Sequence, residues 1–168
     1  MIRHPHQAPH LYPSECGSSM LEFAFSAIIF FTLVFGCVGL TMALYTYEVV
    51  NQYARDASRY AMVRGKNCYL ADLTTSCSIG TGSTANTALK TYLNHQIYPG
   101  INGANLTVGT AYAKAPGAGQ CTTSPSTDCN GSGDQVTVTI TYPYLYNIPF
   151  IPSRPFTMHG SSTMIISQ

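Results

Sequence analysis

An unbroken apolar run near the N-terminus restricts what this chain can fold into. Residues 23–44, FAFSAIIFFTLVFGCVGLTMAL, contain no Asp, Glu, Lys, Arg, Asn, Gln or Pro. About 20 apolar residues in a helix cross the roughly 30 Å hydrocarbon core of a bilayer. The run therefore predicts one transmembrane helix, and the rest of the 168-residue chain suffices for one modest domain.

Two other kinds of N-terminal segment compete with a permanent span. A cleaved secretory signal has an apolar core of about 7 to 15 residues, and the tripeptide at residues 41–43 loosely resembles its cleavage site. This run is longer, and helical sequence continues after it. A lipoprotein anchor has its cysteine after the apolar run, whereas Cys16 precedes it. An uncleaved span is therefore the favoured interpretation.

The helix is expected to continue well beyond the membrane. Pro is absent from Ser18 to Arg64, and Gly65 is placed to end the helix. At 1.5 Å per residue this helix would be about 70 Å long, with roughly half of it outside the bilayer. Spacings of i, i+4, i+7 and i+8 predict a face that packs on the domain. That face comprises Val49, Val50, Tyr53, Ala57, Tyr60, Ala61 and Arg64, opposite Glu48, Gln52, Arg55, Asp56 and Arg59.

The remaining sequence predicts a small α+β domain. Residues 83–100 favour a second short helix that ends at Pro99 and Gly100. Three later runs, at 104–113, 134–146 and 156–167, favour strands, and the middle run alternates aliphatic residues with threonines. Turn-forming residues separate these runs, so we expect an antiparallel meander of about three strands covered by helix.

Four cysteines are placed to reinforce this domain of about 100 residues, a size at which one core is marginal. Cys68 and Cys77 bracket one short loop, and Cys121 and Cys129 bracket another. Three pairings are possible, and the local one, within each loop, is favoured. Zinc binding and free thiols are the alternatives, although neither pair has the CxxC spacing of zinc ribbons. Disulfides would place the domain in an oxidising compartment.

Composition and motifs argue against nucleic-acid binding and catalysis. A net charge of +1 with 9% charged residues offers no basic stripe for a nucleic acid. Beyond the N-terminal 17 residues the histidines are His95 and His159, and Asp72, Asp128 and Asp134 stand apart in the sequence. No serine lies in a nucleophile-elbow pattern. We therefore expect a protein that is not an enzyme and that has no cofactor and no metal site.

An acidic residue, Glu22, stands at the start of the apolar run, in CGSSMLEFAF. An acid at the centre of a membrane helix costs about 3 kcal/mol, and less toward the interface. The positive end of the helix dipole offsets up to about 1 kcal/mol of that cost. An interfacial glutamate near the helix N-terminus is therefore one interpretation.

The spacing favours a second interpretation. Gly17, four residues, Glu22 and the aromatic Phe23, followed by an apolar helix, resemble the class III/type IV prepilin signal. That resemblance implies cleavage between Gly17 and Ser18, which would leave Glu22 as the fifth residue. It also implies that Glu22 and Phe23 take part in peptidase recognition and subunit assembly. Glycine at the cut suits a peptidase that must approach the backbone closely.

Two longer stretches resemble the TadE-like proteins of the tight-adherence (Tad, or Flp) pilus machinery. They are EFAFSAIIFFTLVFG followed by NQYARDASRYAMVRG, and DQVTVTITYPYLYNIPFIPSRPFTMHGSSTMII near the C-terminus. The resemblance implies a pseudopilin or minor pilin that a prepilin peptidase processes. It would act in assembly of an adhesive pilus or a related secretion apparatus. Its partners would be the peptidase, other pilins or pseudopilins, inner-membrane Tad assembly components and membrane lipid.

The implied organisation has three parts. Residues 1–17 would form a prepilin-like leader, residues 18–65 a pilin-like transmembrane and amphipathic helix, and residues 66–168 a periplasmic α+β domain. The protein would cross a bacterial inner membrane once, with its N-terminus in the cytoplasm, and its entry into an extracellular pilus is left open. The alternative is an unprocessed, membrane-anchored periplasmic interaction or adhesin domain. The N-terminus of the mature protein distinguishes the two hypotheses.

Overall fold

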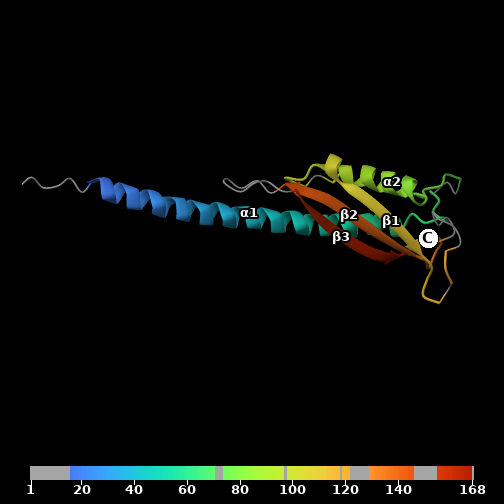
Figure 1. Cartoon of the computed structure of the whole chain (residues 1–168). Coiled ribbons are helices and arrows are strands. Elements are labelled where there is room, and N and C mark those ends of the chain that lie inside the picture. The colour runs from blue at the N-terminus through green and yellow to red at the C-terminus, as the bar shows by residue number, and fades with distance from the viewer. Residues whose placement is uncertain are drawn as a thin grey trace, which may run out of the picture.

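A single long helix dominates the structure, a computed structural model that describes residues 16–70, 74–96, 98–117, 119–121, 129–145 and 155–167. Helix α1 (Cys16–Met62) has 47 residues, which makes it about 70 Å long. Its C-terminal part lies against a sheet, and its N-terminal part projects alone (Figure 1). Within the described residues it is the one helix long and apolar enough to cross a membrane. The predicted continuous helix is confirmed, and it ends shortly before Gly65.

The C-terminal part of α1 packs on the domain through the predicted face. Small and medium side chains at helical spacing are buried there, namely Thr46, Val49, Val50, Tyr53, Ala54, Ala57, Ser58 and Ala61. Arg64 was expected on this face but is only half-buried. Its guanidinium carbon lies 3.8 Å from the centroid of the Tyr60 ring. This stacking lets the aliphatic part of Arg64 pack on the domain while its guanidinium charge stays near water.

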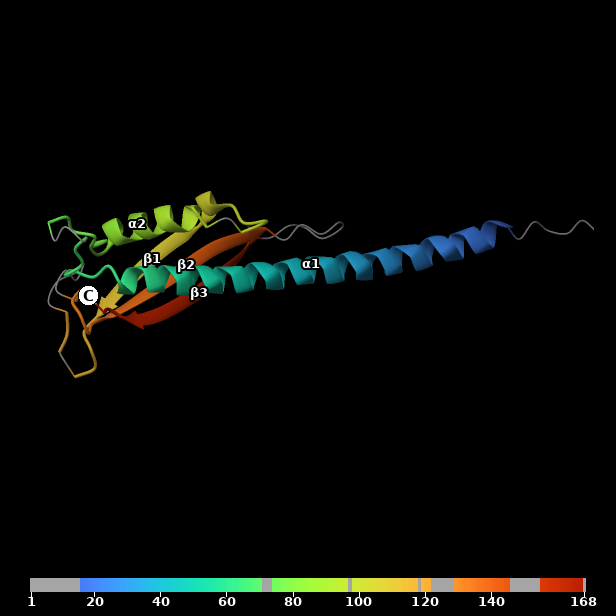
Figure 2. The ribbon, with the colours of Figure 1, turned by 180° about the vertical axis from the view of Figure 1, so that it is seen from behind.

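Three antiparallel strands form the sheet. They are β1 (Thr107–Ala113), β2 (Gln135–Leu145) and β3 (Pro155–Ile165), in the order β1-β2-β3. The predicted meander and the α+β class are confirmed. Along β2, Val136, Val138, Ile140 and Tyr142 are buried at a period of two. Both helices therefore pack on this face, α1 against β2 and β3, as Figure 2 shows from behind, and α2 (Ser83–Asn94) against β1.

Helix α2 is shorter than the sequence suggested. It buries Ala85, Leu89 and Leu93 and ends at Asn94 rather than continuing to Pro99. The backbone N–H groups of His95 and Gln96 donate to carbonyls three residues earlier, which tightens the last turn and stops the helix. A 3-10 turn, η1 (Gly103–Asn105), then leads into β1.

The opposite face of the sheet is polar. No described element packs on it, and it presents threonine, serine and histidine side chains. Cross-strand hydrogen bonds join some of them, with 2.8 Å between the hydroxyls of Thr137 and Thr163 and 3.1 Å from Thr141 Oγ1 to His159 Nδ1. Such polar pairs suit a face in contact with water.

Candidate functional site

The first turn of α1 contains the two residues at which the sequence suggested a cut. Gly17 and Ser18 are both helical and exposed. A Cβ atom added to Gly17 would have no neighbour within 4 Å, and its φ angle is not positive. Because nothing in the described fold requires glycine at this position, its presence calls for a reason outside the fold.

The acidic side chain of Glu22 extends from the second turn of α1. It is exposed, as is the neighbouring Phe23, and no described residue forms an ion pair with Glu22. The helix dipole acts mainly within the first turn, and α1 begins at Cys16. A helix that began at Ser18 would bring Glu22 closer to the positive end of the dipole and to a free amine.

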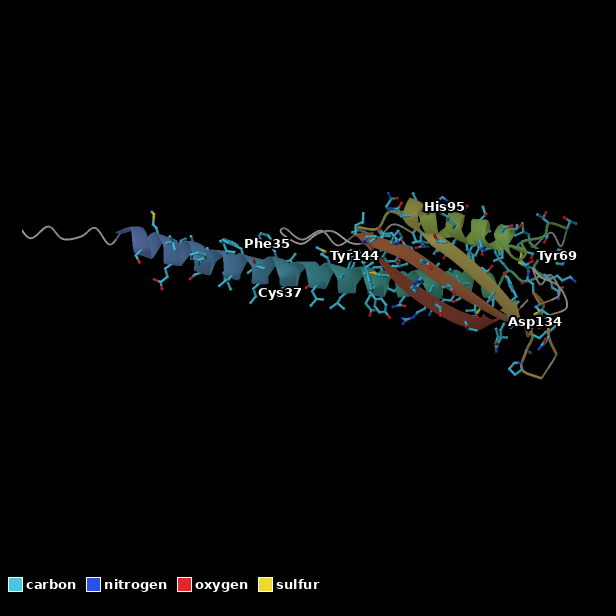
Figure 3. All side chains as sticks on the ribbon, viewed as in Figure 1. Phe35, Cys37, Tyr69, His95, Asp134 and Tyr144 are labelled. Carbon is cyan, nitrogen blue, oxygen red and sulfur yellow. A yellow bond between two sulfur atoms is a disulfide. The ribbon has the colours of Figure 1, made fainter. Side chains whose placement is uncertain are left out.

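Residues 17–45 of α1, called the stalk from here on, form an apolar rod outside the domain. Large side chains are exposed all along it, including Phe25, Ile29, Phe30, Leu33, Leu40, Met42 and Leu44. Figure 3 shows Phe35 and Cys37 on this stretch, away from the sheet. Such a surface needs an apolar environment, a bilayer or other helices.

The two threonines of the stalk satisfy their own hydroxyl groups. Thr32 and Thr41 donate their hydroxyl protons to the carbonyl oxygens of Ile28 and Cys37, at 2.7 and 2.9 Å. This bond to the preceding turn lets a threonine enter hydrocarbon without leaving a free donor. Gly36 also has open space around it, which allows a second helix to approach closely.

Two disulfides lie at the far end of the domain. The structure pairs Cys68 with Cys77 and Cys121 with Cys129, the two local pairs that the sequence favoured, with Cα–Cα distances of 5.2 and 5.8 Å. One cysteine of each pair, Cys68 and Cys129, is buried. Cys37, in the stalk, is a free thiol.

Hydrogen bonds join the two disulfide loops to each other. The backbone N–H of Lys66 donates to the carbonyl of Asn130 at 2.7 Å, and the Asn130 amide donates to the Gly80 carbonyl at 3.2 Å. Tyr112 on β1 donates its hydroxyl to the same Gly80 oxygen at 3.1 Å. Burial raises the pKa of Tyr112 to about 12. These contacts fix the end of the domain farthest from the stalk.

A cavity of about 650 Å³ lies where the stalk meets the domain. Its lining comes from three separate segments, namely Thr41, Met42, Tyr45 and Thr46 of α1, Pro99 and Gly100, and Tyr144 at the end of β2. Of the two tyrosines that flank Tyr144 in the sequence, Tyr142 is buried in the core and Tyr146 lies outside the described residues. We did not predict the cavity from the sequence. The tyrosines close to a proline in residues 141–146 were the available signal for it.

Those polar groups considered for catalysis that the structure describes lie apart from one another. His95 follows the end of α2, whereas His159 is on the polar face of the sheet. Asp134 is buried, and its Oδ2 atom lies 3.8 Å from Lys114 Nζ. Asp72 and Asp128 fall outside the described residues. In the part of the chain that is described, no three His, Cys, Asp or Glu side chains cluster as metal ligands do.

Comparison with known families returned one match. Residues 17–59 match the family model described as TadE-like protein. The matched segment covers the stalk and most of the part of α1 that packs on the sheet. No curated protein and no solved structure matches the chain. The similarity to the family model is thus confined to the long helix.

Proposed function

From the match of residues 17–59 to the TadE-like family model, we propose that this protein is a minor pilin or pseudopilin of a Tad/Flp-type pilus or a related secretion apparatus. The observation that carries the proposal is the stalk. It is an exposed apolar helix whose second turn presents Glu22 without an ion-pair partner among the described residues. A membrane helix that never packs against another subunit rarely contains an unpaired acid, because a charge in hydrocarbon is costly unless an opposite charge pairs with it.

Proteolytic processing is the first step in this proposal. A prepilin peptidase removes residues 1–17 by cutting between Gly17 and Ser18. A side chain at position 17 would not clash with the fold, so the fold does not explain the glycine. This supports a role for Gly17 in access by the peptidase. Since α1 begins at Cys16, its first turn must unwind so that an extended backbone enters the active site.

Pairing between subunits is the second step. The new α-amino group of Ser18 has a pKa near 8 and is largely protonated at neutral pH. As stalks pack side by side, the Ser18 amine of one subunit neutralises Glu22 of another. The apolar surface of the stalk supplies the packing, and Gly36, with open space around it, allows close approach. Cleavage therefore both shortens the chain and creates the cation that the acid needs.

The membrane arrangement follows from the same features. The stalk crosses the inner membrane once, the N-terminus faces the cytoplasm, and the disulfide-bonded domain of residues 66–168 is periplasmic. The two disulfides support this orientation because disulfides persist in oxidising compartments. The partners are the peptidase, other pilins or pseudopilins, inner-membrane Tad assembly components and membrane lipid.

Mass spectrometry of the purified protein tests the proposal. Co-expression with a prepilin peptidase should give a chain that begins at Ser18, and Gly17→Val should retain the leader because a branched side chain blocks the approach. Domain stability should not change in Gly17→Val, since nothing lies within 4 Å of an added Cβ. A wild-type chain that keeps Met1 in the presence of the peptidase would instead indicate an unprocessed membrane-anchored interaction or adhesin domain. A start near Leu44 would indicate a cleaved secretory signal.

A further inference from the structure

The end of the domain nearest the stalk exposes large apolar side chains. Leu145 is 67% exposed and Phe156 is 63% exposed. Both lie at the stalk end of the sheet but on opposite faces, because Phe156 pairs with Tyr144 and Leu145 with Pro155 in the β2–β3 register. Tyr45 of the stalk is 41% exposed and lines the cavity that Pro99, Gly100 and Tyr144 complete. Below, this surface of Tyr45, Pro99, Gly100, Tyr144 and Phe156 is called the stalk-side surface.

The position of this surface along α1 coincides with the edge of the membrane. The apolar run of residues 23–44 is about 33 Å long, which matches the roughly 30 Å hydrocarbon core. Leu44 therefore lies at the boundary, and Tyr45 lies at headgroup level. Thr41 and Met42, which line the same cavity, belong to the apolar run itself. The cavity thus opens at the depth where acyl chains meet headgroups.

The described strand residues at this end of the sheet carry no charge. The described residues of β2, β3 and the following two residues include no Asp, Glu, Lys or Arg. The ion pair of Lys114 and Asp134 lies at the other end of the sheet, and Figure 3 shows Asp134 and Tyr144 at opposite ends of β2. Tyrosines are enriched where proteins meet the bilayer surface, because the ring is apolar and the hydroxyl is polar.

We propose that the domain rests directly on the bilayer through its stalk-side surface, and that phospholipid fills the cavity beside Tyr45 and Tyr144. The proposal rests on the membrane anchoring contained in the proposed function, and it adds a second lipid contact besides the stalk. Phospholipid is the occupant because the cavity is continuous with the stalk surface that lipid surrounds. Two points of contact hold the domain against the bilayer in a fixed orientation until the subunit leaves the membrane.

Spin labels on the full chain in lipid nanodiscs test this arrangement. One label is attached to native Cys37 in the stalk, with Cys16 replaced by alanine. For the others, Cys16 and Cys37 are both replaced by alanine, and the label is attached through Phe156→Cys or Ile165→Cys. Phe156 and Ile165 both lie on β3 with similar exposed fractions, 63% and 60%, at opposite ends of the strand and on opposite faces of the sheet. Their sites are about 30 Å apart along the strand. Frequent collision of the spin label with oxygen indicates that the label is in hydrocarbon. Frequent collision with a water-soluble nickel chelate indicates that it is in water.

The expected result is a gradient along the molecule. The Cys37 label should be in hydrocarbon, and the Phe156 label should collide with nickel several-fold less than the Ile165 label. Equal nickel access at Phe156 and Ile165, with Cys37 in hydrocarbon, would overturn the lipid contact and leave the anchoring intact. A Cys37 label in water would overturn both. A Phe156 label that is shielded only at high protein-to-lipid ratio would show that a second copy, not lipid, covers the surface, and this also overturns the proposal.

Discussion

Gly160 of β3 lies directly against the backbone of α1 at Val50. A Cβ atom built on Gly160 would be 2.9 Å from the Val50 carbonyl oxygen and 3.1 Å from the Asn51 Cα atom. Both of these neighbours are backbone atoms, so neither can move aside without shifting the helix. The absence of a side chain at Gly160 therefore sets how closely the helix approaches the sheet.

The first prediction is that Gly160→Ala destabilises the domain by about 1 to 3 kcal/mol, the usual cost of overpacking a core. Chemical denaturation followed by circular dichroism measures the change in the free energy of unfolding. Gly109→Ala on β1 is the matched control, because its Cβ would make an ordinary contact, 3.8 Å from the Thr139 carbonyl. Equal stability of the two variants would contradict the close packing of α1 on β3.

A second prediction concerns the hydrogen bond between Ser58 of α1 and Ser162 of β3. Their hydroxyl oxygens are 2.8 Å apart, and Ser58 is fully buried. Ser162→Ala should cost about 1 kcal/mol, because the Ser58 hydroxyl loses one partner and keeps its bond to the Arg55 carbonyl. A double-mutant cycle with Ser58→Ala should show a coupling energy above about 0.5 kcal/mol. Strict additivity would mean that the two hydroxyls do not interact.

The third prediction is that each disulfide contributes about 2 to 3 kcal/mol, the chain-entropy value for loops of this size. The sequence separations are 9 and 8. Cys68→Ala/Cys77→Ala should therefore lower the midpoint of denaturation, and Cys37→Ala, which removes the free thiol, should not. Alkylation of the denatured, unreduced protein that begins at Ser18 should modify Cys37 alone. Alkylation at Cys68 or Cys129 would show that the pairs had not formed.

Alkaline pH should weaken the domain through two partly buried tyrosines. Burial raises the pKa of Tyr112 to about 12, above its unfolded value of about 10. Between these values the unfolded chain loses the phenolic proton while the folded chain keeps it. Stability from this group is therefore complete below pH 10 and declines as pH rises from about 10 to 12. Burial first, and the nearby Asp56 carboxylate next, also raise the pKa of Tyr98, so it acts in the same direction.

Denaturation at several pH values, together with the absorbance of tyrosinate, measures this effect. Tyr112→Phe should reduce the alkaline loss of stability, although it also removes the hydrogen bond to Gly80. Tyr69→Phe is the control, since that ring is 54% exposed. If Tyr112→Phe and wild type lost stability in parallel up to pH 12, Tyr112 would not be the group responsible.

The fifth prediction is that Glu22→Gln and Glu22→Ala reduce incorporation into pili several-fold while expression and membrane insertion persist. In the proposed pairing, removal of the carboxylate would leave the Ser18 amine of a neighbouring subunit without its partner. The fraction of subunit in sheared pili, against that in membranes, measures incorporation. Glu48→Gln is the matched control, because Glu48 is an exposed acid on the same helix beyond the apolar run. Normal assembly of Glu22→Ala would refute the pairing mechanism.

Periodicity was sufficient to predict the long helix, its packed face and the strands. Val49, Val50, Tyr53 and Ala57 repeat at helical spacing, and the aliphatic residues of β2 alternate with threonines. These patterns report directly which side chains avoid water. The burial of Ser58 was harder to predict, because this residue is buried only where β3 approaches closely. An isolated glycine inside a strand pattern, Gly160, was the available signal for that approach.

Local sequence patterns could not predict the cavity or the stalk-side surface. They form only where a turn of α1, the Pro99–Gly100 turn and the end of β2 meet, and no periodicity encodes that meeting. The end of α2 was missed for a related reason. Its last turn is set by tight backbone hydrogen bonds at His95 and Gln96 rather than by the proline that follows.

The continuity of α1 has a mechanical consequence. One unbroken helix serves as both the stalk and a central part of the domain core, so no linker separates anchor from head. A tilt of the stalk must swing the head through the same angle, and a pull on the head travels along the helix axis to the stalk. A subunit extracted from the bilayer would therefore move as one rigid body, with the disulfide-bonded end of its domain farthest from the membrane.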